Sequence, residues 1–270
     1  GTPKTIFEDF VKNGEVYSLC TAPDGSIYAG LKGLATAGAE HGWLPEIYHI
    51  STEGTFLNSF TVGEREWNIV DSMATDAQGR LYVRMRMQED GSYVWIYSAE
   101  GELLGTVADD SSYAIKGAGA LGQGKDGKVY AAAQAVGNTT AGDMAMTLVS
   151  VDPESLRFVP LTESENAICS VDTVYPWKMV AAGVSGTADF ILWGYNGVDT
   201  YRLSETEFTR VQESWEMPCG TEGTCAVLVP DGRILYIGAS GGFQGTTADG
   251  VEISGKDPAQ TVLYYEPLAK

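Results

Sequence analysis

Short runs of β-branched, aromatic and leucine residues, separated by turn signals, follow one another along most of the chain. In residues 230–238, a Pro-Asp-Gly turn precedes an apolar run that ends in another glycine. Glycine accepts the positive φ that such turns require, and the run after it is typical of a strand. The same phrase recurs at 23–30, 77–83 and 125–131. The pattern predicts an all-β chain built from a repeated hairpin.

A second phrase, Ser-x-Glu-Gly followed by an apolar run, occurs at 51–57 and again at 98–104, in two consecutive units. Each unit is therefore expected to contain strand, turn, strand, loop, strand and turn, and then a fourth strand. The expected strands are 16–22, 27–31, 46–50 and 55–62, then 68–75, 80–85, 93–97 and 102–107, then 115–121, 128–134, 147–151 and 156–161, then 174–182, 189–195, 198–203 and 208–211, and finally 224–229, 233–238 and 261–266.

Four-stranded units that repeat every ~45–50 residues are typical of a β-propeller, in which blades stack in a ring to bury their faces. We expect a single domain over 1–270, with five blades at about 15–62, 68–107, 113–161, 167–211 and 224–266. The fifth unit lacks a strand, which the lone strand expected at 4–11 would supply, closing the ring and removing a free edge. An extra apolar run at 167–171 and the long connections keep six blades as the alternative.

The net charge of the chain limits the kinds of partner that we expect. Lys and Arg number 17 against 36 Asp and Glu, which gives a net charge of −19. Nucleic acids and anionic membrane surfaces attract basic faces, so we expect neither as a partner. No apolar run approaches the ~20 residues of a membrane span, and we expect no transmembrane segment. The chain is expected to be a monomer.

The four cysteines and two histidines do not match a common metal-ligand spacing, and we expect no metal. Cys219 and Cys225 flank a short glycine-containing loop and are the candidate disulfide pair in an oxidising compartment. Cys20 and Cys169 lie in strand-like runs and are expected to be small core residues. The glycines of 117–122 match a dinucleotide fingerprint, but another strand follows them instead of the required helix, so no cofactor is expected.

The turn phrases at 76–82 and 231–236 resemble the repeats of NHL-type and related bacterial propellers. The stretch from 189–197 through 201–203, Trp215 and 231–234 is similar to propeller regions in secreted lipoproteins of Gram-positive bacteria. Some of those lipoproteins carry an extracellular solute-binding domain. The resemblance implies an extracellular or cell-surface protein whose signal or lipid anchor has been removed.

The expected topology also locates the candidate site. Connections between the second and third strands, and between consecutive units, share one end of the propeller, whereas the Asp-Gly turns share the other. Aromatic and acidic side chains in those longer connections suit a sugar or a cationic ligand, by stacking and hydrogen bonding. The candidate ligand-binding residues are His41, Trp43, Glu64, Glu66, Trp67, Asp109, Asp110, Trp215 and Phe243. Trp95 and Trp193 lie within strand patterns and are expected in the core.

We expect a recognition module that binds rather than catalyses, with a carbohydrate, a small solute or a cell-surface protein as its partner. One alternative is a glycoside hydrolase or lyase, which would need two carboxylates ~5–10 Å apart at the channel mouth. Pairs such as Glu64 and Glu66, or Asp109 and Asp110, are its candidates. The other alternative is a purely structural interaction module. Propellers host many functions, so the fold alone does not choose among these.

Overall fold

The protein is all-β, and the described part of the chain contains no helix. The computed structural model describes residues 16–32, 44–66, 68–87, 91–108, 115–116, 121–135, 146–160, 176–181, 190–194, 197–203, 208–215, 225–228, 233–239, 244–246, 252–254 and 261–267, and from residue 160 on it describes the backbone alone. No helix in those ranges could cross a membrane.

Three sheets have four antiparallel strands each, in the order in which the strands follow along the chain. The first contains β1 (Val16–Thr21), β2 (Ile27–Leu31), β3 (Glu46–Ile50) and β4 (Phe56–Thr61). The second contains β5 (Val70–Thr75), β6 (Leu81–Met85), β7 (Ser92–Tyr97) and β8 (Leu103–Ala108). The third of these contains β14 (Pro176–Ala181), β15 (Phe190–Gly194), β16 (Gly197–Leu203) and β17 (Phe208–Trp215).

The remaining sheets depart from that regular order. Between the second and the β14–β17 sheets lies a five-stranded sheet of β9 (Ile115–Lys116), β10 (Leu121–Gln123), β11 (Val129–Ala135), β12 (Met146–Asp152) and β13 (Arg157–Pro160). The C-terminal strands are β18 (Cys225–Leu228), β19 (Arg233–Ala239) and β22 (Thr261–Pro267), with a separate pair, β20 (Gln244–Thr246) and β21 (Glu252–Ser254). The prediction placed one strand at 115–121; β9 and the start of β10 fall in that range and pair with β11, while residues 117–120 lie outside the described residues. The β20–β21 hairpin was not predicted.

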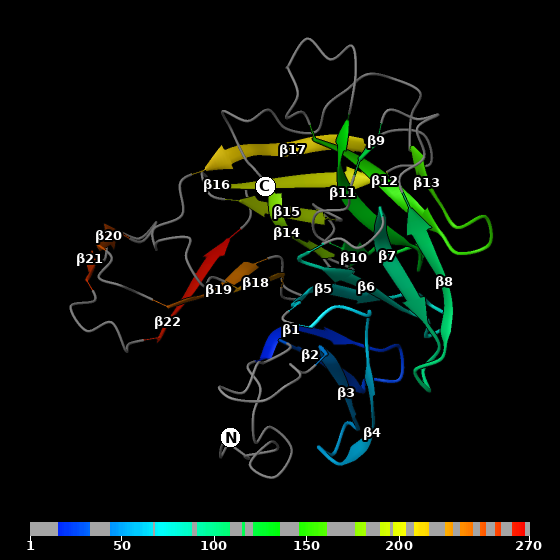
Figure 1. Cartoon of the computed structure of the whole chain (residues 1–270). Helices are drawn as coiled ribbons and strands as arrows, with labels where there is room; N and C mark the ends of the chain where they lie inside the picture. The colour runs from blue at the N-terminus through cyan, green and yellow to red at the C-terminus, as the bar shows by residue number, and fades with distance from the viewer. Residues whose placement is uncertain are drawn as a thin grey trace.

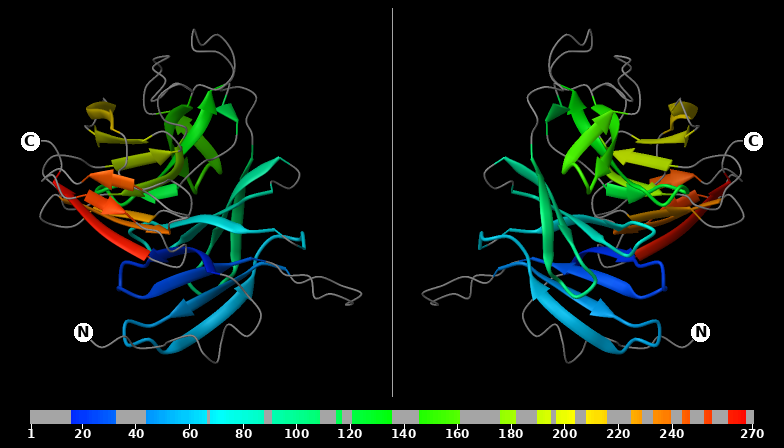
Figure 2. Two further views of the ribbon diagram at one scale, coloured as in Figure 1. Left: turned by 90° about the vertical axis from the view of Figure 1, so that its left-hand side faces the viewer. Right: turned by 90° about the vertical axis from the view of Figure 1, so that its right-hand side faces the viewer.

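Successive sheets meet through their first strands. β1 contacts β5, β5 contacts β10, β10 contacts β14, and β14 contacts β18. Figure 1 shows the sheets following one another around a common centre, from the blue sheet at the bottom, through green and yellow, to the red strands on the left. Figure 2 agrees with Figure 1 that the C-terminal strands lie next to the first sheet. The predicted strand at 4–11 lies outside the described residues.

The inner strands β5, β6 and β7 of the second sheet are mostly buried on both faces, which explains their nearly continuous apolar runs, whereas the outer strand β8 is largely exposed. One face packs on the first sheet through side chains that include Met73, Leu81 and Trp95. The other face packs on the β9–β13 sheet through Tyr82, Ile96 and others. Alternate residues of a strand point to opposite faces, so neighbouring residues serve two different cores. The prediction that Trp95 is a core residue is confirmed, with 6% of its surface exposed.

The glycine turns between the first two long strands of the first three units, β1–β2, β5–β6 and β10–β11, share one geometry. The amides of Gly25, Gly79 and Gly127 donate to the carbonyl three residues earlier, over 2.9, 3.0 and 2.9 Å. Their φ angles of 86°, 84° and 81° favour glycine over any side-chain-bearing residue. Adjacent turns also contact each other, since the amide of Ala77 donates to the carbonyl of Gly127 over 2.9 Å. These turns lie together at one end of the sheets.

Candidate ligand-binding site

The antiparallel order of the strands gives the molecule two unlike ends. We call the end with the tight turns, such as 22–26, 76–80, 98–102 and 124–128, the turn face. The opposite end, where β2 leads to β3 and β4 leads to β5, is the loop face. Binding residues are commonly carried by loops on a rigid scaffold, so the loop face is the first place to search.

A β-bulge interrupts the first strand of three sheets where that strand reaches the loop face. The register of β1 on β2 shifts between Val16 and Ser18, which leaves Tyr17 as the extra residue. The same shift leaves Asp71 extra in β5 and Trp177 extra in β14. Bulges re-aim a side chain and are frequent beside functional sites. Three equivalent bulges carrying three different residue types therefore mark this end of the first strands.

Basic side chains gather around the first bulge. The Nζ of Lys32 lies 5.9 Å from the centroid of the Tyr17 ring, and the guanidinium carbon of Arg86 lies 5.5 Å from it. Both distances fall in the range of a cation–π attraction. Lys32 follows the end of β2 and Arg86 follows the end of β6, so two sheets contribute to the group.

Asp71 joins the second bulge to the same group. Its Oδ1 accepts a hydrogen bond from Nη2 of Arg86 over 3.0 Å, and its Oδ2 accepts from Nη1 of Arg84. The Arg84 side chain is 18% exposed and that of Arg86 is 51% exposed, so one arginine supports the carboxylate while the other reaches solvent. We call Tyr17, Lys32, Asp71, Arg84 and Arg86 the Tyr17 cluster.

The Arg84 side chain carries an uncompensated donor. Its Nε is buried and has no hydrogen-bond partner among the described residues. A buried donor without a partner costs free energy, because it has lost its bonds to water. Arg84 therefore has an ion-pair partner in Asp71 but only part of its hydrogen-bonding capacity is used.

The backbone beneath the Tyr17 cluster is held on two sides. Ser18 Oγ donates to the carbonyl of Val70 over 2.7 Å, which ties β1 to β5 and brings the two bulges together. The fully buried Asn68 donates to the carbonyl of Met87 over 2.7 Å and accepts from its amide over 2.9 Å. These bonds fix the chain on both sides of Arg86 and hold its position.

The predicted site residues are distributed differently. Glu64 is exposed and Glu66 is partly exposed, in the connection from β4 to β5 on the loop face. Trp215 was expected in a loop, but its backbone ends β17 and pairs with Val198 of β16. Cys225 begins β18, and Cys219, its predicted disulfide partner, lies outside the described residues. The predicted residues His41, Trp43, Trp67, Asp109, Asp110 and Phe243 also lie outside the described residues.

The sequence search missed the Tyr17 cluster because, apart from Lys32 at the start of the connection 32–45, its members stand in or beside strands. Asp71 was the available signal, since it is the one charged residue in the mostly apolar run of 69–74. Arg84 and Arg86 flank Met85 in a strand that otherwise reads as core. Charged residues in an inner strand require a partner, and a search for those partners would have found the group.

A second polar group contains a serine, a histidine and an aspartate, the residue types of a hydrolase triad, but its serine donates its proton to the aspartate and not to the histidine. Ser26 Oγ lies 2.6 Å from Oδ1 of Asp24 and 2.7 Å from Nε2 of His49. Hydrogen bonds from Ser26 hold the pKa of Asp24 below its usual value, so the carboxylate is an acceptor and takes the single hydroxyl proton. His49 must then donate through Nε2 and cannot remove that proton. Ser26 is also 2% exposed, so this group is structural.

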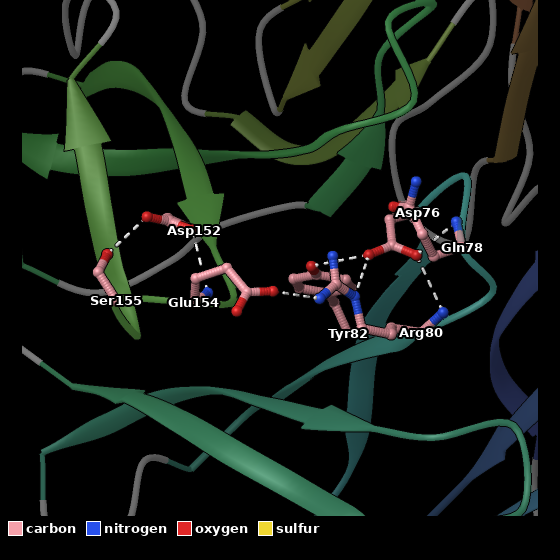
Figure 3. A network of polar contacts seen from close by, with 7 residues as sticks. All are labelled: Asp76, Gln78, Arg80, Tyr82, Asp152, Glu154 and Ser155. Atoms are coloured by element: carbon pink, nitrogen blue, oxygen red, sulfur yellow. Dashed lines mark hydrogen bonds and ion pairs between the residues drawn. The ribbon is translucent and has the colours of Figure 1, made fainter.

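The turn face carries a third polar network, drawn in Figure 3. Asp76, whose side chain is 3% exposed, accepts from Nε of Arg80 over 2.6 Å and from the hydroxyl of Tyr82 over 3.1 Å. Arg80 then reaches Glu154 in the turn between β12 and β13 over 3.0 Å. Burial and the neighbouring Asp76 raise the pKa of Tyr82, which keeps its hydroxyl a donor. The network joins two sheets across their turns.

No group of His, Cys, Asp and Glu suited to a metal ion occurs in the part of the chain that the structure describes. No family model matches the chain, and no curated protein matches it.

The likeness to solved structures is one of fold. A protein of unknown function from Dyadobacter fermentans has a TM-score of 0.51 and 14% identity, over 94% of this chain and 78% of that chain. A protein of unknown function from Bacteroides caccae has a TM-score of 0.45 and 11% identity, over 87% of this chain and 72% of that chain. The extracellular domain of a one-component system from B. thetaiotaomicron has a TM-score of 0.41 and 12% identity, over 97% of this chain and 30% of that chain.

Proposed function

We propose that the protein is an extracellular or cell-surface β-propeller that recognises a ligand or a protein on its loop face without transforming it. The contacts between the first strands of successive sheets support the propeller architecture. The five-bladed count and a ring closed by an N-terminal strand belong to the same proposal. The fold likeness to the Dyadobacter fermentans protein is consistent with it.

The observation that carries the recognition role is the set of bulges at the loop-face end of the first strands. The same backbone irregularity presents Tyr17 in one sheet and Asp71 in the next. The bulge keeps its place in successive sheets while its side chain differs, and a binding surface on a repeat scaffold requires this combination. The glycoside hydrolase alternative stays a prediction, because Asp109 and Asp110 lie outside the described residues.

The test is a binding screen with a thermal-shift readout, over neutral and charged oligosaccharides, small metabolites and calcium. A ligand that binds the native state alone raises the melting temperature by mass action. Tyr17→Ala should abolish the shift and leave the melting temperature of the free protein nearly unchanged, since Tyr17 is partly exposed. Glu154→Ala, on the turn face, is the control and should keep the shift. Loss of the shift in the Glu154 variant with retention in the Tyr17 variant would overturn the proposal.

A further inference from the structure

We propose that the Tyr17 cluster binds an oxyanion, a carboxylate, sulfate or phosphate group, carried by the ligand. This inference rests on the proposed recognition role and names the chemistry that the loop face selects. It runs against the overall charge of the molecule, which is −19. A basic site on so acidic a chain is therefore a local arrangement and not a property of the whole surface.

The first argument is the local charge. Three cationic side chains, Lys32, Arg84 and Arg86, stand beside the single carboxylate of Asp71, and among the described residues only the two arginines pair with it. Lys32 forms no ion pair with any described residue and instead lies over the Tyr17 ring. The cluster thus retains excess positive charge, part of it in side chains that reach solvent. Neighbouring cations repel one another, and an incoming anion relieves that repulsion.

The second argument is the geometry of the donors. Arg86 uses Nη2 to bind Asp71, and half of its side-chain surface is exposed at 51%. A guanidinium presents five N–H groups in a planar fork, so a partner on one side leaves donors for a second oxyanion. Lys32, which lies over the same ring, adds a rotatable ammonium. A carboxylate, sulfate or phosphate at the edge of the Tyr17 ring would receive charge-assisted hydrogen bonds from whichever of these donors it reaches.

The third argument is that the site is organised before any ligand arrives. Asp71 fixes the two arginines, and the two-way bond between Asn68 and Met87 fixes the backbone beside Arg86. Ordering long side chains is a main cost of binding, and here the protein has already met part of it. The Arg84 guanidinium, held by Asp71, is part of this fixed arrangement, and its buried Nε has no hydrogen-bond partner among the described residues.

The Tyr17 ring further limits the class of ligand that would fit the site. A partly exposed aromatic ring beside cationic donors suits a ligand with an apolar or sugar face next to its anionic group. A uronic-acid oligosaccharide has this combination, whereas an inorganic ion has the charge alone. Comparison of the two separates binding of an oxyanion within a larger ligand from simple ion binding.

The experiment is isothermal titration calorimetry at low ionic strength with four probes: trigalacturonate, its neutral galactose counterpart, inorganic phosphate and sodium sulfate. We expect trigalacturonate to bind, phosphate and sulfate to compete with it, and the neutral sugar to bind at least tenfold more weakly. Arg86→Met and Lys32→Met should each weaken binding by about tenfold, the usual effect of losing a charge-assisted bond. Added salt should weaken it further. Lys128→Met removes the same charge from the turn face and should leave binding unchanged.

The outcomes separate this inference from the proposed function. If a neutral ligand from the screen binds, is lost in Tyr17→Ala and is unaffected by Arg86→Met and Lys32→Met, the recognition role stands and the oxyanion site is wrong. If Lys128→Met weakens anion binding as much as Arg86→Met, the binding is general charge attraction and the site is also wrong. If no anionic probe binds, the inference fails whatever the screen shows. If the whole screen is also silent, the recognition of such ligands fails with it.

Discussion

The turn face and the loop face are built on the same strands but treat their side chains in opposite ways. On the turn face, Gly25, Gly79 and Gly127 repeat one hydrogen bond and one backbone angle. On the loop face, the equivalent bulges carry Tyr17 and Asp71. The repeated glycine turns at one end stabilise the sheets, whereas the different bulge residues at the other end can serve recognition. The comparison predicts that turn-face changes cost stability and loop-face changes cost binding.

The largest expected effect is that of Asp76→Ala. The substitution leaves the partly buried Arg80 and the buried Tyr82 hydroxyl without their shared acceptor, and it removes the cap of the turn amides of Gln78 and Arg80. Leaving such groups unpaired costs about 3 kcal/mol. The free energy of unfolding, measured by urea denaturation, should fall by this order.

Asp126→Ala is the matched control for Asp76→Ala. Asp126 occupies the neighbouring turn, accepts from the hydroxyl of Tyr130 over 2.8 Å and is exposed, with no arginine partner described. Its removal should cost about 1 kcal/mol. Equal losses in the two variants would show that burial of Asp76 does not set the strength of its network.

Acidification is expected to weaken the turn face in two steps. Burial lowers the pKa of His49 from 6.5, so the unfolded chain takes up a proton before the folded one does. Stability should therefore fall as the pH drops below about 6.5. Hydrogen bonds from Ser26 lower the pKa of Asp24 from 3.8, and its contribution is lost at still lower pH. Melting temperatures from pH 7.5 to 5 should decline in the wild type and decline less in His49→Gln.

The matched loop-face variant for the pH series is Arg86→Met. It changes a charge without touching the group of Ser26 and His49, so it should keep the slope of the wild type. If Arg86→Met flattened the pH dependence as much as His49→Gln, the acid sensitivity would not belong to the turn face.

The smallest expected effect is that of Glu154→Ala. The ion pair of Glu154 with Arg80 spans two sheets, but the Glu154 side chain is 85% exposed. Solvent screening reduces such pairs to about 0.5 kcal/mol. The loss should shrink further in high salt, which can be followed by thermal melts. A loss as large as that of Asp76→Ala would mean that the contact between the turns matters more than the buried carboxylate.

Strand positions were predictable because their signals are local. Strands β2 and β3 match the predicted 27–31 and 46–50 residue for residue, since the Asp-Gly turn before β2 and the Ser-x-Glu-Gly turn after β3 define them within a few positions. The all-β class is confirmed for the same reason. The change of register on β11 between β9 and β10 escaped prediction, because a register is a relation to the partner strand and not a property of one stretch of sequence.

The candidate site was less predictable for a related reason. A bulge is a relation between two strands, and nothing in residues 16–18 or 70–72 alone reveals that the register shifts there. Lys32 follows β2 and Arg86 follows β6, so they are far apart in the sequence, and only the folded structure places both beside the Tyr17 ring. The sequence could locate the loop face from turn chemistry, but the choice of residues on that face depends on packing between sheets.

The strand order within the four-stranded sheets has a consequence for how the chain acquires its structure. Each of these sheets comes from one continuous stretch and pairs every strand with the next in sequence. Pairing of this kind closes short loops, so it carries a small entropic barrier and favours rapid formation of each unit. As the chain leaves the ribosome, the β1–β4 sheet can form before β5 is synthesised, and it then offers an apolar face on which the next unit packs. The order of synthesis and the order of assembly would then be the same.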